Sequence, residues 1–138
     1  RWPEAEGILD YLGQEKIGCV VFSPLAQGML SPKYVDSIPA DSRAARAEGL
    51  LQEDQVLAQQ EKIRALDHVA KSQGMPLHHM AIQFSLKHRA VTSAIIGARN
   101  VAQLDDTLAA LDAPKLSEAT LKNIDSIAPT RQSRDAES

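Results

Sequence analysis

The sequence predicts an α/β fold with parallel strands that belongs to a larger sheet or barrel. Two short apolar runs, Cys19–Phe22 and Val91–Ile96, do not alternate with polar residues, a pattern typical of strands buried on both faces. Helical patterns precede, separate and follow these runs, so helices and strands alternate along the chain. A sheet of only these strands would leave both outer edges unpaired, which indicates that further strands complete it.

The first helix is expected over Glu4–Gln14. Pro3 suits its first position, and Ile8, Leu9 and Leu12 form its apolar stripe. After the first strand, residues 23–52 contain three prolines and two glycines and show no sustained periodicity. A loop of this length inside a compact domain is usually functional or mobile.

The longest helix is predicted over Glu53–Gln73 and ends before Gly74. Its apolar face consists of Val56, Ile63, Leu66, Val69 and Ala70. Pro76 then opens a shorter helix that continues to His88, before the second strand. The inward residues of this shorter helix are Met80, Ala81 and Phe84.

Two more helices are predicted after the second strand. Asn100 can cap the first, with Gln103 reaching back toward the cap, and Ser117 can cap the second. The apolar stripes of these helices are Leu104, Leu108 and Leu111, and then Leu121, Ile124 and Ile127. We therefore expect one domain over residues 1–128 and a disordered tail over 129–138, which is almost free of apolar residues.

Composition restricts the class of protein and of partner. The chain has 138 residues and a net charge of −3 without a basic block, so nucleic acids and anionic membranes are not expected partners. Its apolar runs are too short to span a bilayer. The single cysteine, Cys19, cannot form an internal disulfide, which favours a cytoplasmic location. The chain starts with Arg-Trp-Pro and not with Met, so we expect it to be a piece of a longer protein.

The residues that follow each strand resemble a phosphate site. Ser23–Gly28 follows the first strand, with Lys33 and Arg43 farther along the loop. Gly97–Asn100 follows the second strand and leads into a helix N-terminus, whose free N–H groups attract anions. Gly97 permits close approach of the backbone to a ligand, and Arg99 adds a planar cationic fork. These features predict a site for a large phosphorylated cofactor.

The same residues resemble the aldo-keto reductases. "FSPLAQGMLSPKY" followed by "IPADSR" is similar to the loop after strand seven in this family, and "SAIIGARNVAQLDDTLAAL" is similar to the end of strand eight and the helix after it. The nearest subgroup contains the potassium-channel β-subunits and bacterial glyceraldehyde-3-phosphate reductases. The resemblance extends over residues 8–127. It implies the C-terminal part of a (β/α)8 TIM barrel, comprising strands seven and eight with their helices.

The resemblance also implies an activity, the NADPH-dependent reduction of an aldehyde or ketone to an alcohol. The loop after the first strand would line the pyrophosphate and nicotinamide, the second strand end would hold the 2′-phosphate, and the start of the next helix would lie near the adenine. The implied cofactor-binding residues are Phe22, Ser23, Pro24, Leu25, Gln27, Lys33, Asp41, Arg43, Gly97, Arg99, Gln103, Asp106 and Thr107. The sequence departs from the family at Pro32, where Gly is usual, and at Asp106-Thr107, where Glu-Asn is usual.

The catalytic Asp, Tyr, Lys and His of the family lie on segments that this chain does not contain. Tyr11 and Tyr34 are its only tyrosines, and neither occurs in the catalytic motif. We therefore predict no catalytic residue, and we expect the chain alone to be inactive. The implied partners are a small carbonyl substrate and either a second copy or a missing N-terminal half. Two alternatives stay open: a nucleotide-sensing regulatory subunit like the channel β-subunits, or an unrelated phosphate-binding α/β module.

The remaining reactive side chains favour ordinary structural roles. Adjacent residues on a helix point about 100° apart, so His78 and His79 are expected to be solvated or capping residues, and no metal site is predicted. His68 and His88 are expected at the surface. Cys19 opens an apolar strand and is expected to be an inert thiol in the core.

Overall fold

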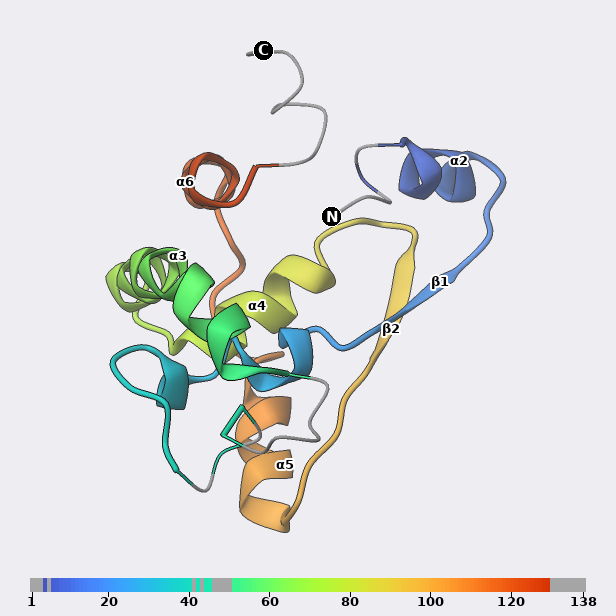
Figure 1. Cartoon of the computed structure of the whole chain (residues 1–138). Coiled ribbons are helices and arrows are strands. Elements are labelled where there is room, and N and C mark those ends of the chain that lie inside the picture. The colour runs from blue at the N-terminus through green and yellow to red at the C-terminus, as the bar shows by residue number, and fades with distance from the viewer. Residues whose placement is uncertain (1–3, 5, 41, 43, 46–50, 130–138) are drawn as a thin grey trace.

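The computed structural model of the chain describes residues 4, 6–40, 42, 44–45 and 51–129 (Figure 1). The predicted tail beyond residue 129 and the predicted site residues Asp41 and Arg43 lie outside the described residues. The elements, in chain order, are α2 (Ile8–Gln14), β1 (Cys19–Phe22), η1 (Ala26–Gly28), η2 (Pro32–Tyr34), α3 (Glu53–Ser72), α4 (Leu77–Ser85), β2 (Val91–Ile95), α5 (Val101–Ala109) and α6 (Glu118–Ile127).

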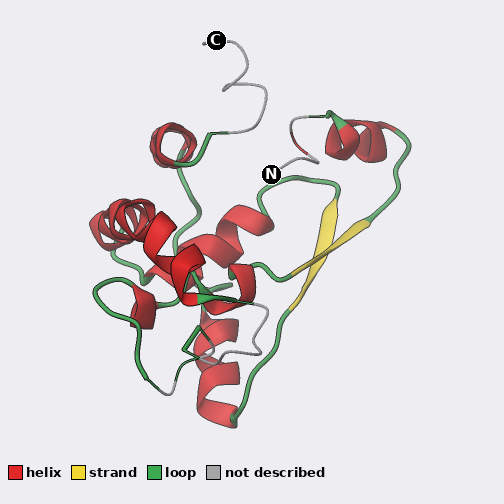
Figure 2. Ribbon diagram, in the orientation of Figure 1, coloured by secondary structure: helices red, strands yellow, loops and turns green. Residues whose placement is uncertain are grey.

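Strands β1 and β2 pair in parallel, as the sequence predicts (Figure 2). The register aligns Phe22 with Ile95 at the carboxyl ends of the two strands, and a local irregularity follows Cys19. Helices α3 and α4 lie in the connection between the strands, as expected for a crossover between parallel strands. Because the strands run in the same direction, the loops that follow Phe22 and Ile95 leave from the same end of the sheet.

The prediction that both strands are buried on both faces is wrong for this chain. Along β1 the residues alternate between half-buried and exposed, and Val20 and Phe22 are 56% and 79% exposed. Ile95, the partner of Phe22 in β2, is also exposed. The physical reason is that the described helices cover only one face of this sheet, so the apolar residues on its other face have no cover within the described chain.

The hydrophobic core lies among the helices. Figure 1 shows α3, α4 and α6 grouped on one side of the strands, and the largest fully buried side chains come from α3, α4 and η2. These side chains are Tyr34, Ile63, Leu77 and Val56. The Tyr34 hydroxyl accepts a hydrogen bond from the Ala44 N–H at 3.2 Å, which connects the long loop to the core. The predicted inward face of the long helix is confirmed.

Truncation of a core side chain in α3 should destabilise the fold. Ile63 is 1% exposed, so Ile63→Ala should lower the free energy of unfolding by about 2–5 kcal/mol through lost burial and the cavity it leaves. Leu57, on the same helix and 55% exposed, is the matched control, and Leu57→Ala should change it by less than about 0.5 kcal/mol. Urea unfolding followed by circular dichroism measures both, and equal effects would contradict the assignment of the core.

The helix ends agree with most of the predicted signals. Asn100 accepts a hydrogen bond from the Gln103 N–H, and Ser117 accepts one from the Thr120 N–H, so both predicted caps are confirmed. Helix α2 starts at Ile8 instead of residue 4, because Gly7 has a left-handed backbone with φ of 69° that interrupts the helix.

The predicted core stripe of α5 is wrong. Leu104, Leu108 and Leu111 are all exposed, because α5 packs on α4 through a different face. Within the described residues, no helix is both long enough and apolar enough to cross a membrane.

Candidate cofactor site

The loop after β1 is held in an unusual backbone shape. Ser23, Ala26 and Gln27 have φ values of 52°, 48° and 60°, a left-handed region that side chains with a Cβ rarely adopt, and Gly28 follows at 96°. Such conformations cost on the order of 1–3 kcal/mol each and cluster at ligand sites and switch regions. Two short turns, η1 and η2, shape the loop, and the Ser31 hydroxyl donates to the Gly28 carbonyl at 2.6 Å.

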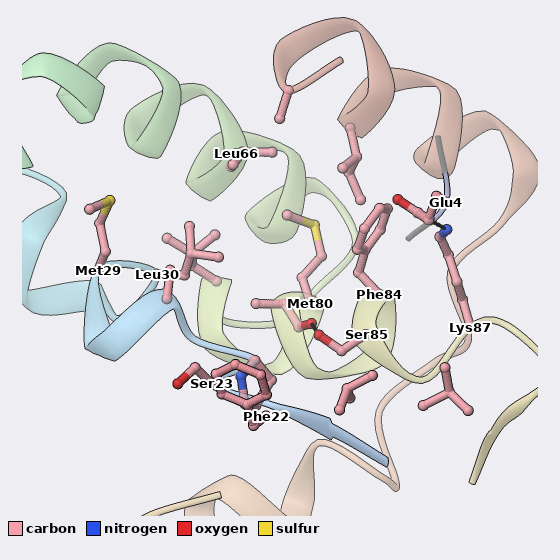
Figure 3. A pocket seen from close by; sticks show the side chains of 18 of the residues that line it. Glu4, Phe22, Ser23, Met29, Leu30, Leu66, Met80, Phe84, Ser85 and Lys87 are labelled. Carbon is pink, nitrogen blue, oxygen red and sulfur yellow. Dashed lines mark hydrogen bonds and ion pairs between the residues drawn. The ribbon is translucent and has the colours of Figure 1, made fainter. Parts of the chain in front are cut away.

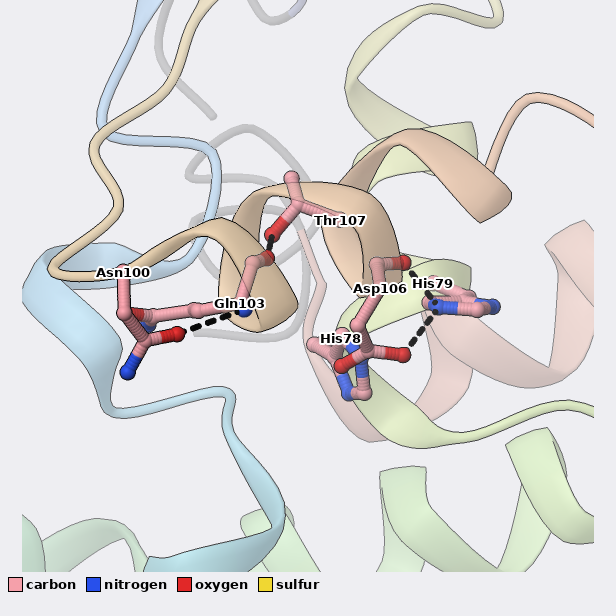
Figure 4. Close-up of polar contacts among 6 residues, drawn as sticks. All are labelled: His78, His79, Asn100, Gln103, Asp106 and Thr107. Carbon is pink, nitrogen blue, oxygen red and sulfur yellow. Dashed lines mark hydrogen bonds and ion pairs between the residues drawn. The ribbon is translucent and has the colours of Figure 1, made fainter.

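The chain after β2 leads directly into the N-terminus of α5 (Figure 4). The Asn100 side chain accepts from the Gln103 N–H at 2.8 Å, and the Gln103 side chain accepts from the Arg99 N–H at 2.9 Å. Gln103 therefore reaches back, as expected, but to the residue before the cap. The space beside Gly97 is open, since a Cβ placed there would meet no atom within 4 Å.

The loops after both strands line one open cavity of about 810 Å³, called the polar cavity below because polar and charged side chains contribute to its lining. This volume falls within the range of about 300–1,000 Å³ that small-molecule and cofactor sites occupy. Ten predicted site residues line it: Phe22, Ser23, Pro24, Leu25, Gln27, Lys33, Gly97, Arg99, Gln103 and Thr107. Gly28, Ala98 and Asn100, from the predicted strand-end segments, also line it. Ser31, Ile95 and Ile96 line it as well and were not predicted, although each lies close in sequence to a predicted residue.

The electrostatics of the cavity favour an anion. Arg99 and Lys33 both line it, and neither forms an ion pair with a described residue. The Lys33 ammonium lies 4.7 Å from the centre of the Tyr34 ring, a cation–π contact that steadies it beside the loop. The N-terminus of α5 adds the partial positive charge of a helix end. Phosphate groups fit this set of donors.

Asp106, which the resemblance places near the adenine, does not line this cavity. Its carboxylate faces α4, where it lies 2.8 Å from His78 Nε2 and 3.2 Å from His79 Nε2. Both histidines are 8% exposed and contact Asp106 inside α5, so the prediction that they are solvated or capping residues is wrong. Both rings turn toward one carboxylate on the neighbouring helix. The angle of about 100° between adjacent residues of a helix does not show where a second helix places its side chains.

An apolar cavity of about 500 Å³ lies between β1 and helices α3 and α4 (Figure 3). Met29, Leu30, Leu66, Met80 and Phe84 are among its lining side chains. Cys19 also lines it and is half-buried, so the thiol is less enclosed than predicted.

Neither tyrosine is placed to donate a proton in the polar cavity. Tyr34 is fully buried in the core, and Tyr11 is exposed on α2. Burial alone would raise the pKa of Tyr34, but the neighbouring Ser42, the Ala44 N–H and the Lys33 ammonium lower it on balance. Its hydroxyl oxygen accepts a hydrogen bond from the Ala44 N–H within the core, which suits a structural role.

Comparison with known proteins identifies the chain's relatives. The chain is 36% and 37% identical over 129 residues to the L-glyceraldehyde 3-phosphate reductases of Escherichia coli O157:H7 and Escherichia coli strain K12. These matches cover 91% of this chain but only 37% of each relative, so the chain spans little more than a third of their length.

Solved structures support the same fold. The holo form of an aldo-keto reductase from Bacillus halodurans superposes with a TM-score of 0.64 at 23% identity, and its apo form with a TM-score of 0.59. The holo match covers 96% of this chain and 41% of that protein. Residues 1–129 match the Aldo/keto reductase family. The chain therefore belongs to the aldo/keto reductase family.

Proposed function

We propose that this chain is the NADPH-binding part of an aldo-keto reductase that reduces an aldehyde or ketone to an alcohol. In this proposal β1 and β2 are strands seven and eight of a (β/α)8 barrel, whose active sites lie at the carboxyl ends of the strands. The observation that carries it is the polar cavity at that end of the sheet, lined by the loops after both strands.

In this proposal, the cationic side chains and backbone N–H groups of the cavity bind the phosphate groups of the cofactor. Arg99 holds the 2′-phosphate with its planar fork, a geometry that a lysine cannot reproduce. Lys33 and the backbone of Ser23–Gly28 bind the pyrophosphate, while the open space beside Gly97 admits the ligand next to the backbone. The adenine contact expected of Asp106 stays a prediction, because this carboxylate faces the histidines of α4.

The proposed reaction needs a hydride donor and a proton donor. NADPH, when bound, supplies the hydride for carbonyl reduction. The residues of this chain bind and orient the cofactor, and Phe22 and Pro24 contribute apolar surface to the cavity wall. Transfer of a proton to the carbonyl oxygen needs an acid within hydrogen-bond reach, and we assign no residue of this chain to that step.

The binding step can be tested on this chain directly by isothermal titration with NADPH. We expect a single site, competition by adenosine 2′,5′-bisphosphate and weaker competition by adenosine 5′-monophosphate, which lacks the 2′-phosphate. Equal competition by the two nucleotides would contradict the role given to Arg99. The absence of any NADPH binding by the folded chain would contradict its assignment as a cofactor-binding part.

The exposed apolar side chains of the sheet and of the region beside α5 favour contact with a partner. Phe22 and Ile95 on the sheet and Leu111 beside α5 are exposed, and an unpaired strand edge favours further pairing. We propose that a second copy or an N-terminal barrel segment covers this surface in a cytoplasmic protein. Light scattering should therefore give a molar mass above that of the monomer, and a monomer at high concentration would count against self-association.

A further inference from the structure

We propose that His78, His79 and Asp106 form a binding site for a divalent transition-metal ion such as zinc, at the contact between α4 and α5. Within the part of the chain that the structure describes, these three residues offer ligand atoms that all lie within 4.8 Å of one another. Figure 4 shows the carboxylate of Asp106 directed from α5 toward the two imidazole rings of α4.

The distances suit a metal after a small adjustment. His78 Nε2 lies 2.8 Å from Asp106 Oδ2, and His79 Nε2 lies 3.2 Å from Oδ1. Bonds of about 2.0–2.2 Å to a tetrahedral zinc ion place neighbouring ligand atoms roughly 3.3–3.5 Å apart. These two separations are slightly shorter, and the three ligand atoms all lie within 4.8 Å of one another, so rotations of the side chains could bring them around one ion.

The surrounding structure holds the ligands in position. Both histidines are buried, and their rings meet edge to face with centres 4.5 Å apart. Gln83, farther along α4, donates hydrogen bonds to the Ala110 carbonyl at 2.7 Å and the Ala113 carbonyl at 3.0 Å. These bonds fix α4 against the end of α5 independently of any ion. The Asp106 side chain is 55% exposed, so an ion can enter from solvent.

The donor set selects the class of ion. Imidazole nitrogens suit zinc, copper, nickel and iron, whereas magnesium and calcium prefer oxygen ligands. Three protein ligands would leave a fourth position for water, as in open zinc sites. His78 Nδ1 is buried without a hydrogen-bond partner among the described residues, so His78 lacks the outer partner that usually strengthens a metal ligand. We therefore expect affinity about 10–100-fold below that of a fully supported site.

The competing explanation is a hydrogen-bonded contact between α4 and α5 that takes no ion. His79 Nε2 also lies 2.7 Å from the Asp106 backbone carbonyl, a bond that an ion would have to replace. Isothermal titration of the metal-free, tag-free chain with zinc chloride separates the two explanations. We expect one equivalent of zinc to bind, and we expect cobalt(II) at the same site to give a visible absorption band.

Matched variants locate the site. Asp106→Asn and His79→Gln should each weaken zinc binding by more than about 100-fold, beyond the loss of an outer partner alone. The double variant His68→Gln, His88→Gln should bind like the wild type. It removes an exposed histidine and the His88 ring, whose Nε2 lies 3.2 Å from Asp10 Oδ1. Circular dichroism verifies that each variant is folded.

A measurement on the wild type keeps the test independent of folding defects. In its NMR spectrum, zinc should shift the imidazole signals of His78 and His79 and leave those of His68 and His88 in place. The proposal is overturned if the folded wild type binds no zinc, if Asp106→Asn binds as tightly as the wild type, or if the signals of His68 or His88 shift instead.

Discussion

Arg99→Ala is expected to weaken NADPH binding by about 1.5–3 kcal/mol, the range for a hydrogen bond to a charged group. This corresponds to a dissociation constant roughly 10- to 150-fold higher. NADH lacks the 2′-phosphate, so its affinity should stay nearly unchanged. The physical reason is that Arg99 lines the polar cavity and has no ion-pair partner among the described residues, which leaves its guanidinium available to a ligand. Paired fluorescence titrations with both cofactors measure the difference.

Two further variants separate charge from geometry. Arg99→Lys keeps the charge but loses the planar fork, so it should recover only part of the affinity. Arg89→Ala removes the same charge from an exposed position that does not line the polar cavity, and it should have little effect on either cofactor. Equal losses for NADPH and NADH in Arg99→Ala would indicate that Arg99 supports the fold and does not contact the 2′-phosphate.

The second large effect concerns turnover. The chain alone should show no carbonyl reduction, because no tyrosine lines the polar cavity and the lack of a general acid costs about 10²–10⁴ in rate. Tyr34 is not placed to act as this acid, since it is fully buried in the core and does not line the polar cavity.

NADPH absorbance with glyceraldehyde as the substrate tests this expectation, with a full-length aldo-keto reductase as the positive control. Steady NADPH consumption by the chain, abolished in Arg99→Ala, would contradict it and would require a proton donor among the residues present.

The elements with strong local signals could be predicted from the sequence. The apolar run at β1, the long apolar face of α3 and the caps at Asn100 and Ser117 all depend on neighbouring residues, and all are observed. The parallel pairing could also be predicted, because a long helical connection between two apolar runs is typical of parallel strands and not of a hairpin.

What covers each face could not be predicted from these patterns. The exposure of Phe22 and Leu108 depends on which elements pack against them in three dimensions. The sequence pattern of an apolar stripe is the same whether the stripe is covered or exposed. The convergence of His78 and His79 on Asp106 likewise depends on how α4 and α5 pack. The left-handed backbone at position 27 could not be predicted either, because the residue there is Gln and not Gly.

The most direct test of the cofactor site is a map of amide chemical shifts during NADPH titration of the chain. We expect the largest changes in two separate segments, 23–33 and 97–107, because the loops after both strands line one cavity. Signals from α6, which does not line that cavity, should hardly move. Changes confined to one segment, or centred on the apolar cavity beside α3 and α4, would contradict a shared cofactor site at the ends of β1 and β2.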